Sequence, residues 1–140
     1  LGLPQLKKVD AMWEWRKKIA ARYFEGLKDL DLITLPTVKT DRESSWHLFP
    51  IRLNLDMITK NRAQIIDELK NNNVGVGVHF MPVHQHLYYS ETFKLDDKNY
   101  PVASGAFPRL MSLPIYPGMT DTSVEKVINT LIEILNKYRR

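Results

Sequence analysis

Residues 74–84 have the sequence VGVGVHFMPVH, which contains the clearest two-residue alternation in the chain. Because successive side chains of a β-strand point to opposite faces, the alternation predicts a strand over residues 74–80. One face of this strand would carry the bulky apolar residues Val74, Val76, Val78 and Phe80. The other face would carry only Gly75, Gly77 and His79. A face with two glycines predicts close approach by another backbone or by a ligand.

Three other segments also favour extended structure. Residues 46–53 (WHLFPIRL) alternate in the same way, with His47, Phe49, Ile51 and Leu53 on one face. Pro50 cannot donate a backbone hydrogen bond, which predicts that this strand lies at an edge or contains a bulge. Residues 31–35 form a short extended piece, and residues 112–116 (SLPIY) form a short strand.

Four helices are expected around these strands. Apolar residues recur at helical spacing over residues 4–27, on a face wide enough to pack on more than one neighbour, such as another domain. Thr59 is the expected cap of a helix over 60–72, and the asparagines at 71–73 are its expected stop. A short helix is predicted over 101–110. Thr122 and Glu125 have the spacing of a capping box that begins the last helix.

The fold class predicted from this order is α+β (α/β), with a small sheet of about three strands covered by helices. The 140 residues have the length of one domain, and we expect a single domain over 1–140. The first residue is Leu1, which suggests a fragment of a longer protein.

The composition excludes several classes of protein. The chain is 44% apolar and 26% charged, as in soluble globular proteins, and it contains no apolar run of about 20 residues that would span a membrane. It contains no cysteine, which excludes disulfides and thiolate chemistry and fits a cytoplasmic protein. The net charge of +4 favours an anionic ligand and is too small to indicate nucleic-acid binding.

The strongest candidate for a functional segment begins at the end of the predicted glycine-faced strand. Three of the four histidines, His79, His84 and His86, fall within eight residues and are followed by Tyr88 and Tyr89. Histidine exchanges protons near neutral pH and binds phosphate or sugar hydroxyls, and tyrosine adds stacking surface. Two alternatives remain open. The three histidines are either ordinary loop and strand-end residues or the ligands of a zinc site. Their spacing matches no common metal motif.

Outside this segment, the arginine and tryptophan residues each allow two interpretations. Arg52 ends a predicted strand, where it would either clamp a carboxylate or phosphate or form a surface salt bridge. The three tryptophans would either stack on a nucleotide base or belong to the core: Trp13, Trp15 and Trp46.

Several ordered pieces of the sequence resemble the C-terminal part of the DegT/DnrJ/StrS family of pyridoxal-phosphate (PLP) sugar aminotransferases. The pieces are the helix with Arg16, Ile19-Ala20 and Tyr23, then His47-Leu48-Phe49-Pro50-Ile51-Arg52-Leu53, then Val78-His79-Phe80-Met81-Pro82-Val83-His84 with Tyr88-Tyr89, and then Ser112-Leu113-Pro114-Ile115-Tyr116-Pro117. Their order and spacing together carry the resemblance, which covers nearly the whole chain.

The resemblance implies an enzyme that transfers an amino group from glutamate to a keto nucleotide-sugar, for surface polysaccharide, lipopolysaccharide or amino-sugar synthesis. It implies a PLP–lysine Schiff base in a preceding domain, a homodimer, and a first helix over 4–27 that connects to the PLP-binding domain. The lysine would lie outside these 140 residues, so the isolated chain is expected to be inactive.

By position, the resemblance assigns His79, Phe80, His84, Tyr88 and Tyr89 to the wall of the sugar-nucleotide site. Several relatives have tyrosine where Phe80 stands, so one possible hydroxyl contact is missing here. The alternatives from other classes are a stand-alone binding module for an anionic ligand such as a nucleotide sugar, and a small hydrolase with a histidine metal site.

Overall fold

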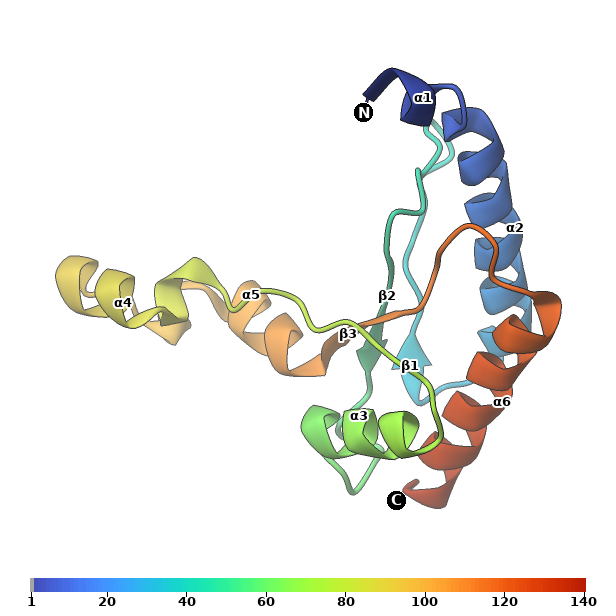
Figure 1. The fold of residues 1–140 in the computed structure, drawn as a ribbon. Helices are drawn as coiled ribbons and strands as arrows, with labels where there is room; N and C mark the ends of the chain where they lie inside the picture. Colours follow the sequence, from blue (N-terminus) through green and yellow to red (C-terminus); the bar gives the residue numbers. More distant parts are fainter. Residues whose placement is uncertain (1) are drawn as a thin grey trace.

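A computed structural model describes residues 2–140, which form a three-stranded antiparallel sheet and six α-helices (Figure 1). The strands are β1 (Ile33–Thr34), β2 (Phe49–Leu53) and β3 (Leu110–Leu113), in the order β1-β2-β3. In the register of the sheet, Leu53 pairs with Ile33 and Ile51 pairs with Met111. This agrees with the predicted fold class, a small sheet of about three strands with helices.

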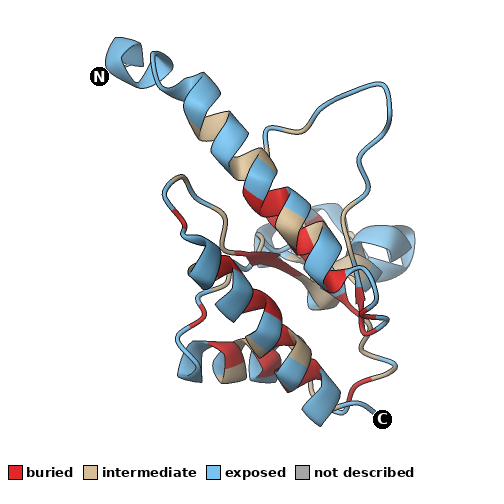
Figure 2. Cartoon of the chain, turned by 90° about the vertical axis from the view of Figure 1, so that its right-hand side faces the viewer, coloured by how far each residue is buried: buried red, intermediate tan, exposed pale blue. Residues whose placement is uncertain are grey.

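The core lies between one face of the sheet and three helices, α2 (Val9–Leu27), α3 (Arg62–Asn71) and α6 (Asp121–Lys137) (Figure 2). Alternation along β2 buries Phe49, Ile51 and Leu53, as the sequence pattern predicts. Tyr23 of α2 packs its ring on Phe49 and donates its hydroxyl to the Pro114 carbonyl oxygen at 2.6 Å. Burial raises the pKa of this hydroxyl, so it remains a donor.

The predicted single helix over 4–27 is wrong, because the chain forms α1 (Gly2–Leu6) and then α2. The Lys8 N–H donates to the Gln5 carbonyl, a three-residue spacing that tightens the backbone into a turn between the two helices. Only the second half of α2 is buried in the core, at Ile19, Ala20, Tyr23 and Leu27.

Two predicted helix caps are also wrong. α3 is capped by Asn61 rather than Thr59, because Asn61 and Gln64 exchange side-chain and backbone hydrogen bonds in a capping box. α6 is capped by Thr120 rather than Thr122, and the Thr120 hydroxyl accepts from the Ser123 N–H. The predicted stop after α3 is confirmed, since Asn73 has a left-handed φ of 59°.

β2 is the central strand, so the prediction that Pro50 marks an edge or a bulge is wrong. Pro50 pairs with Ser112, whose backbone N–H and carbonyl both bond to Gly77 on the far side of β3. The Pro50 nitrogen therefore faces the β1 side, where the two-residue β1 has already ended. A short neighbouring strand thus makes the missing N–H harmless.

The predicted strand over 74–80 is wrong as well, because this segment forms only one isolated bridge, Gly77 to Ser112. Val74 is buried and Val76 packs on the core, whereas Val78 and Phe80 face outward. The last strand begins at Leu110 and ends at Leu113, earlier than the predicted 112–116. On the opposite edge of the sheet, β1 lies within the extended piece predicted over 31–35 and pairs with β2.

Residues 81–107, here called the arm, project away from the core (Figure 1). The arm contains a 3-10 turn over Val83–Gln85, α4 (Leu87–Phe93), a 3-10 turn over Asp97–Asn99, and α5 (Pro101–Ala106). α5 and the 3-10 turn Phe107–Arg109 together confirm the helix predicted over 101–110. At its base, the Arg62 guanidinium donates to the Phe107 and Leu110 carbonyl oxygens and lies over the Phe107 ring.

Candidate functional site

The outer face of the sheet, opposite the core, carries the first candidate residue. Pro50 and Ser112 lie opposite each other on this face, and Gly77 bonds to Ser112 through both its N–H and its carbonyl at 2.9 Å. His79 Nε2 lies 2.9 Å from Ser112 Oγ. The predicted strand-end histidine is therefore half-buried and fixed against β3, and one ring nitrogen is occupied by a buried hydroxyl.

The close approach predicted for the glycine face is seen at one of its two glycines. Gly77 meets the β3 backbone, and a Cβ built there would lie 3.7 Å from Ser112 Cβ, which is ordinary contact. Nothing in residues 2–140 lies within 4 Å of a Cβ at Gly75. Close backbone approach is thus confirmed at Gly77 and wrong at Gly75.

The aromatic candidates lie on the exposed surface of the arm and its entry. Phe80 is 98% exposed, and Tyr88 is 66% exposed. Tyr88 and Tyr89 contact each other edge to face at 5.3 Å, and Tyr89 stacks on Phe93 at 6.1 Å. Tyr88, Tyr89 and Phe93 form one exposed aromatic cluster, and Phe80 is a separate exposed ring at the entry to the arm. Exposed apolar surface on this scale marks a binding face more often than an ordinary surface.

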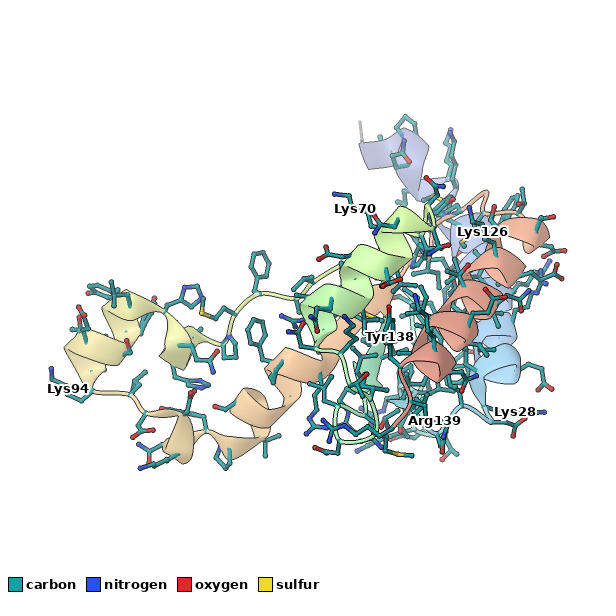
Figure 3. All side chains as sticks on the ribbon, turned by 90° about the horizontal axis from the view of Figure 1, so that it is seen from below. Lys28, Lys70, Lys94, Lys126, Tyr138 and Arg139 are labelled. Atoms are coloured by element: carbon teal, nitrogen blue, oxygen red, sulfur yellow. The ribbon has the colours of Figure 1, made fainter. Side chains whose placement is uncertain are left out.

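His84 holds the arm together. It is the one buried residue within 81–107. Its Nε2 lies 3.0 Å from Asp97 Oδ1 and 2.9 Å from Ser104 Oγ, and its ring stacks on Tyr100 at 4.5 Å. The two limbs of the arm, which run out to and back from Lys94 at its tip, are joined by these contacts (Figure 3).

Asp97 is the electrostatic centre of the arm. A hydrogen bond from the Gln85 amide, and then those from Ser104 and His84, lower the pKa of this carboxyl below its ordinary value. The Gln85 Nε2 donates to Asp97 Oδ1 at 2.8 Å. The carboxylate therefore stays ionised and accepts from both limbs of the arm.

The three clustered histidines are not assembled into one site. His79 bonds to Ser112, His84 to Asp97 and Ser104, and His86 Nε2 lies 3.1 Å from the Met81 carbonyl oxygen. Across residues 2–140, no group of three or more His, Asp or Glu side chains is placed to hold a metal ion.

None of the helices formed by residues 2–140 is long and apolar enough to cross a membrane.

The arginine and the three tryptophans that allowed two interpretations lie in different environments. Arg52 lies exposed on the outer sheet face, and within residues 2–140 it has no salt bridge. Trp13 donates its indole N–H to the Ser44 carbonyl oxygen at 2.9 Å, and Trp46 packs on Phe24. Trp15 is half-exposed on α2. The strand predicted over 46–53 begins only at Phe49, and His47, expected on its inward face, is exposed. Sequence patterns gave no prediction for residues 37–45.

The lysines of this chain do not fit a PLP Schiff base. A Schiff-base lysine needs a desolvated amine with a lowered pKa, and none of the lysines in residues 2–140 is buried. Lys17 and Lys28 donate hydrogen bonds to Glu14 and Glu25, which raises the pKa of both lysines. Contact with Tyr138 and Glu68 raises the pKa of Lys137. These surroundings stabilise the ammonium form of lysine. The lysines of residues 2–140 are therefore not suited to form a Schiff base with PLP.

Comparison with known proteins gives the class of the chain. The solved structure of the putative sugar aminotransferase Spr1654 from Streptococcus pneumoniae, in its PLP form, matches with a TM-score of 0.86 and 30% identity, over 97% of this chain and 34% of that one. The fold is thus that of sugar aminotransferases. The family model of the DegT/DnrJ/EryC1/StrS aminotransferases matches residues 1–132, and the chain belongs to this family.

Two relatives match nearly the whole chain. The uncharacterized protein MJ1066 of Methanocaldococcus jannaschii is 40% identical over 139 residues, which is 99% of this chain and 36% of the relative. The spore coat polysaccharide biosynthesis protein SpsC of Bacillus subtilis is 36% identical over 136 residues, which is 96% of this chain and 35% of SpsC. The chain therefore spans about a third of the length of the relatives it matches.

Proposed function

We propose that residues 1–140 are the C-terminal domain of a PLP-dependent aminotransferase that moves an amino group from glutamate to a keto nucleotide-sugar. The observation that carries the proposal is the family match over residues 1–132. SpsC takes part in polysaccharide biosynthesis, which supports a role in making surface or other amino-sugar polymers. The PLP form of Spr1654 supports PLP as the cofactor.

The rest of the enzyme would hold the cofactor. PLP supplies an electron sink for transamination when it is bound, and the lysines found here, none of which is buried, do not suit it. We place the Schiff-base lysine in a preceding PLP-binding domain and expect the 140 residues alone to be inactive. The exposed first half of α2 is the proposed contact with that domain. The enzyme is proposed to be a cytoplasmic homodimer.

Within this chain, the outer sheet face and the arm would form the wall of the sugar-nucleotide site. His79 is held by Ser112 and presents the rest of its ring to a substrate hydroxyl or phosphate. Phe80, Tyr88 and Tyr89 would offer aromatic surface to the sugar ring and exclude water from it. His84 would act through the arm, because its ring is buried among Asp97, Ser104 and Tyr100.

The full-length natural polypeptide with PLP tests this proposal. With glutamate and a keto nucleotide-sugar, it should form 2-oxoglutarate and the amino nucleotide-sugar in equal amounts. Phe80→Ala and Tyr88→Ala should raise the KM for the sugar nucleotide about tenfold, as expected for the loss of one aromatic contact. Tyr116→Ala removes an exposed ring outside the arm and serves as the matched control.

Two results would reject the proposal. Absence of 2-oxoglutarate with every keto nucleotide-sugar tried would reject the activity. An unchanged KM for the sugar nucleotide in both Phe80→Ala and Tyr88→Ala, in an active enzyme, would reject the arm and its entry as the substrate wall.

A further inference from the structure

The segment between β1 and β2 forms a cavity that the site described above does not use. This segment runs beside α2 toward its N-terminal end (Figure 1), where Trp13 bonds to the Ser44 carbonyl oxygen. The cavity has a volume of about 510 Å³, within the range of small-molecule sites. Its lining combines apolar residues with two cations and one carboxylate, and includes Lys39, Arg42, Glu43, Trp46, Leu48 and Pro50.

The floor of the cavity is apolar and rigid. Trp46, Leu48 and Pro50 all line the cavity, and the half-buried ring of Trp46 also packs on the core. Trp46 has φ of 48°, a backbone region that bulky residues rarely adopt and that is often found at functional sites. Its ring is fixed by Phe24 at 5.5 Å and Phe49 at 5.6 Å. Leu48 is 47% exposed, although it lies in an apolar run.

The charge around the cavity favours an anion. Arg42 is paired with Asp41 at 2.8 Å, and Glu43 is paired with Lys17 at 3.5 Å. Among residues 2–140, Lys39 has no salt-bridge partner, so its positive charge remains uncompensated at the cavity wall. An aromatic and apolar floor beside a lysine suits a flat heterocycle that carries a phosphate.

The cavity and the candidate site are linked through Pro50. Pro50 lines the cavity and lies opposite Ser112, whose hydroxyl bonds to His79. Arg52 follows on the same face, about 7 Å further along the strand at the rise of an extended chain. A ligand seated on Trp46 and Leu48 would therefore extend toward His79 and the arm.

We propose that this cavity binds the nucleoside-phosphate end of the substrate, with the base on Trp46, Leu48 and Pro50 and a phosphate on Lys39. The inference rests on the proposed function, which assigns the sugar end to His79 and the arm. It divides the substrate site into two parts, a nucleotide end formed by residues 38–50 and a sugar end formed by His79 and residues 80–89.

Binding of uridine 5′-monophosphate and adenosine 5′-monophosphate to the full-length polypeptide tests the inference. Titration is followed by the indole N–H signal of Trp46, assigned from the signal that disappears in Trp46→Phe. Leu48→Glu should weaken binding about tenfold by placing a carboxylate on the floor, and Lys39→Ala about threefold. Both side chains are exposed, so the fold should be retained.

Leu6→Glu and Lys18→Ala introduce the same changes of charge at exposed positions elsewhere and should leave nucleotide affinity unchanged. Equal affinity in Leu48→Glu and Leu6→Glu would overturn the inference. A movement of the Trp15 signal in place of the Trp46 signal would overturn it as well.

Transamination kinetics separate this inference from the proposed function. In an active enzyme, Leu48→Glu should raise the KM for the nucleotide-sugar while kcat for saturating substrate is retained; an unchanged KM rejects the cavity and leaves the activity standing. Nucleotide binding at Trp46 in a polypeptide with no transaminase activity rejects the proposed function and supports the cavity as a nucleotide site.

Discussion

The core and the arm use the same kinds of side chain in opposite ways. In the core, Tyr23 and Phe49 are fully buried against helices and sheet. In the arm and its entry, Phe80 and Tyr88 face outward, and a single buried histidine takes the place of a hydrophobic core. The core is thus stabilised by burial of apolar surface, whereas the arm is stabilised by a few polar contacts. Its exposed rings are therefore available for binding.

The largest effect should come from the core. Phe49→Ala removes a fully buried ring that contacts Tyr23, Phe24 and Trp46, and should lower the free energy of unfolding by about 3–5 kcal/mol. Urea denaturation of the natural polypeptide measures this loss. A loss below about 1 kcal/mol would mean that the sheet and α2 do not form one packed core.

A smaller and local effect is expected at His84. His84→Ala removes the contacts to Asp97, Ser104 and Tyr100 and should destabilise the arm by about 1–3 kcal/mol while leaving the core unchanged. Amide hydrogen exchange should become faster in residues 81–107 alone. His86→Ala, at an exposed histidine, is the control. Faster exchange across the core in the His84 variant would contradict the separation of arm from core.

The arm should also loosen in acid. The pKa of Asp97 is lowered in the folded arm, chiefly by the Gln85 amide, so its stabilising contribution is present above the unfolded value and lost as the pH falls through the folded one. The chemical shifts of the Tyr100 ring, followed from pH 6 to pH 2, should report this loosening. Asp97→Asn should flatten the transition, and Asp67→Asn, on α3, should leave it in place.

The smallest effect on stability should come from Phe80. Phe80→Ala removes a ring that is almost fully exposed and should change the free energy of unfolding by less than about 0.5 kcal/mol. The same urea measurement used for Phe49→Ala gives a direct comparison of two phenylalanines. A large loss at Phe80 would show that its ring is covered in the natural polypeptide.

The sequence predicted the parts of the fold in which periodicity and burial coincide. The inward face of β2 follows from alternation, because this strand packs one face on the core. The strand expected over 74–80 failed for a tertiary reason. Only Gly77 pairs its backbone with β3, and the chain beyond His79 leaves the sheet for the arm.

The candidate site was predicted only in part. The histidine and tyrosine cluster was visible as composition, and the family resemblance gave it a role. The separate contacts of its members depend on Asp97, Ser104 and Ser112, which lie 13 to 33 residues away in the chain. Trp46 was noted as an aromatic residue, but neither its left-handed backbone nor the cavity beside it leaves a periodic signal.

Borohydride reduction of the natural polypeptide, followed by mass mapping of the modified peptide, tests the central claim most directly. We predict one pyridoxyl group on a lysine that lies outside residues 1–140, because none of the lysines described here is buried. A pyridoxyl group fixed specifically to one of these lysines, or a natural polypeptide that retains no PLP, would contradict the account.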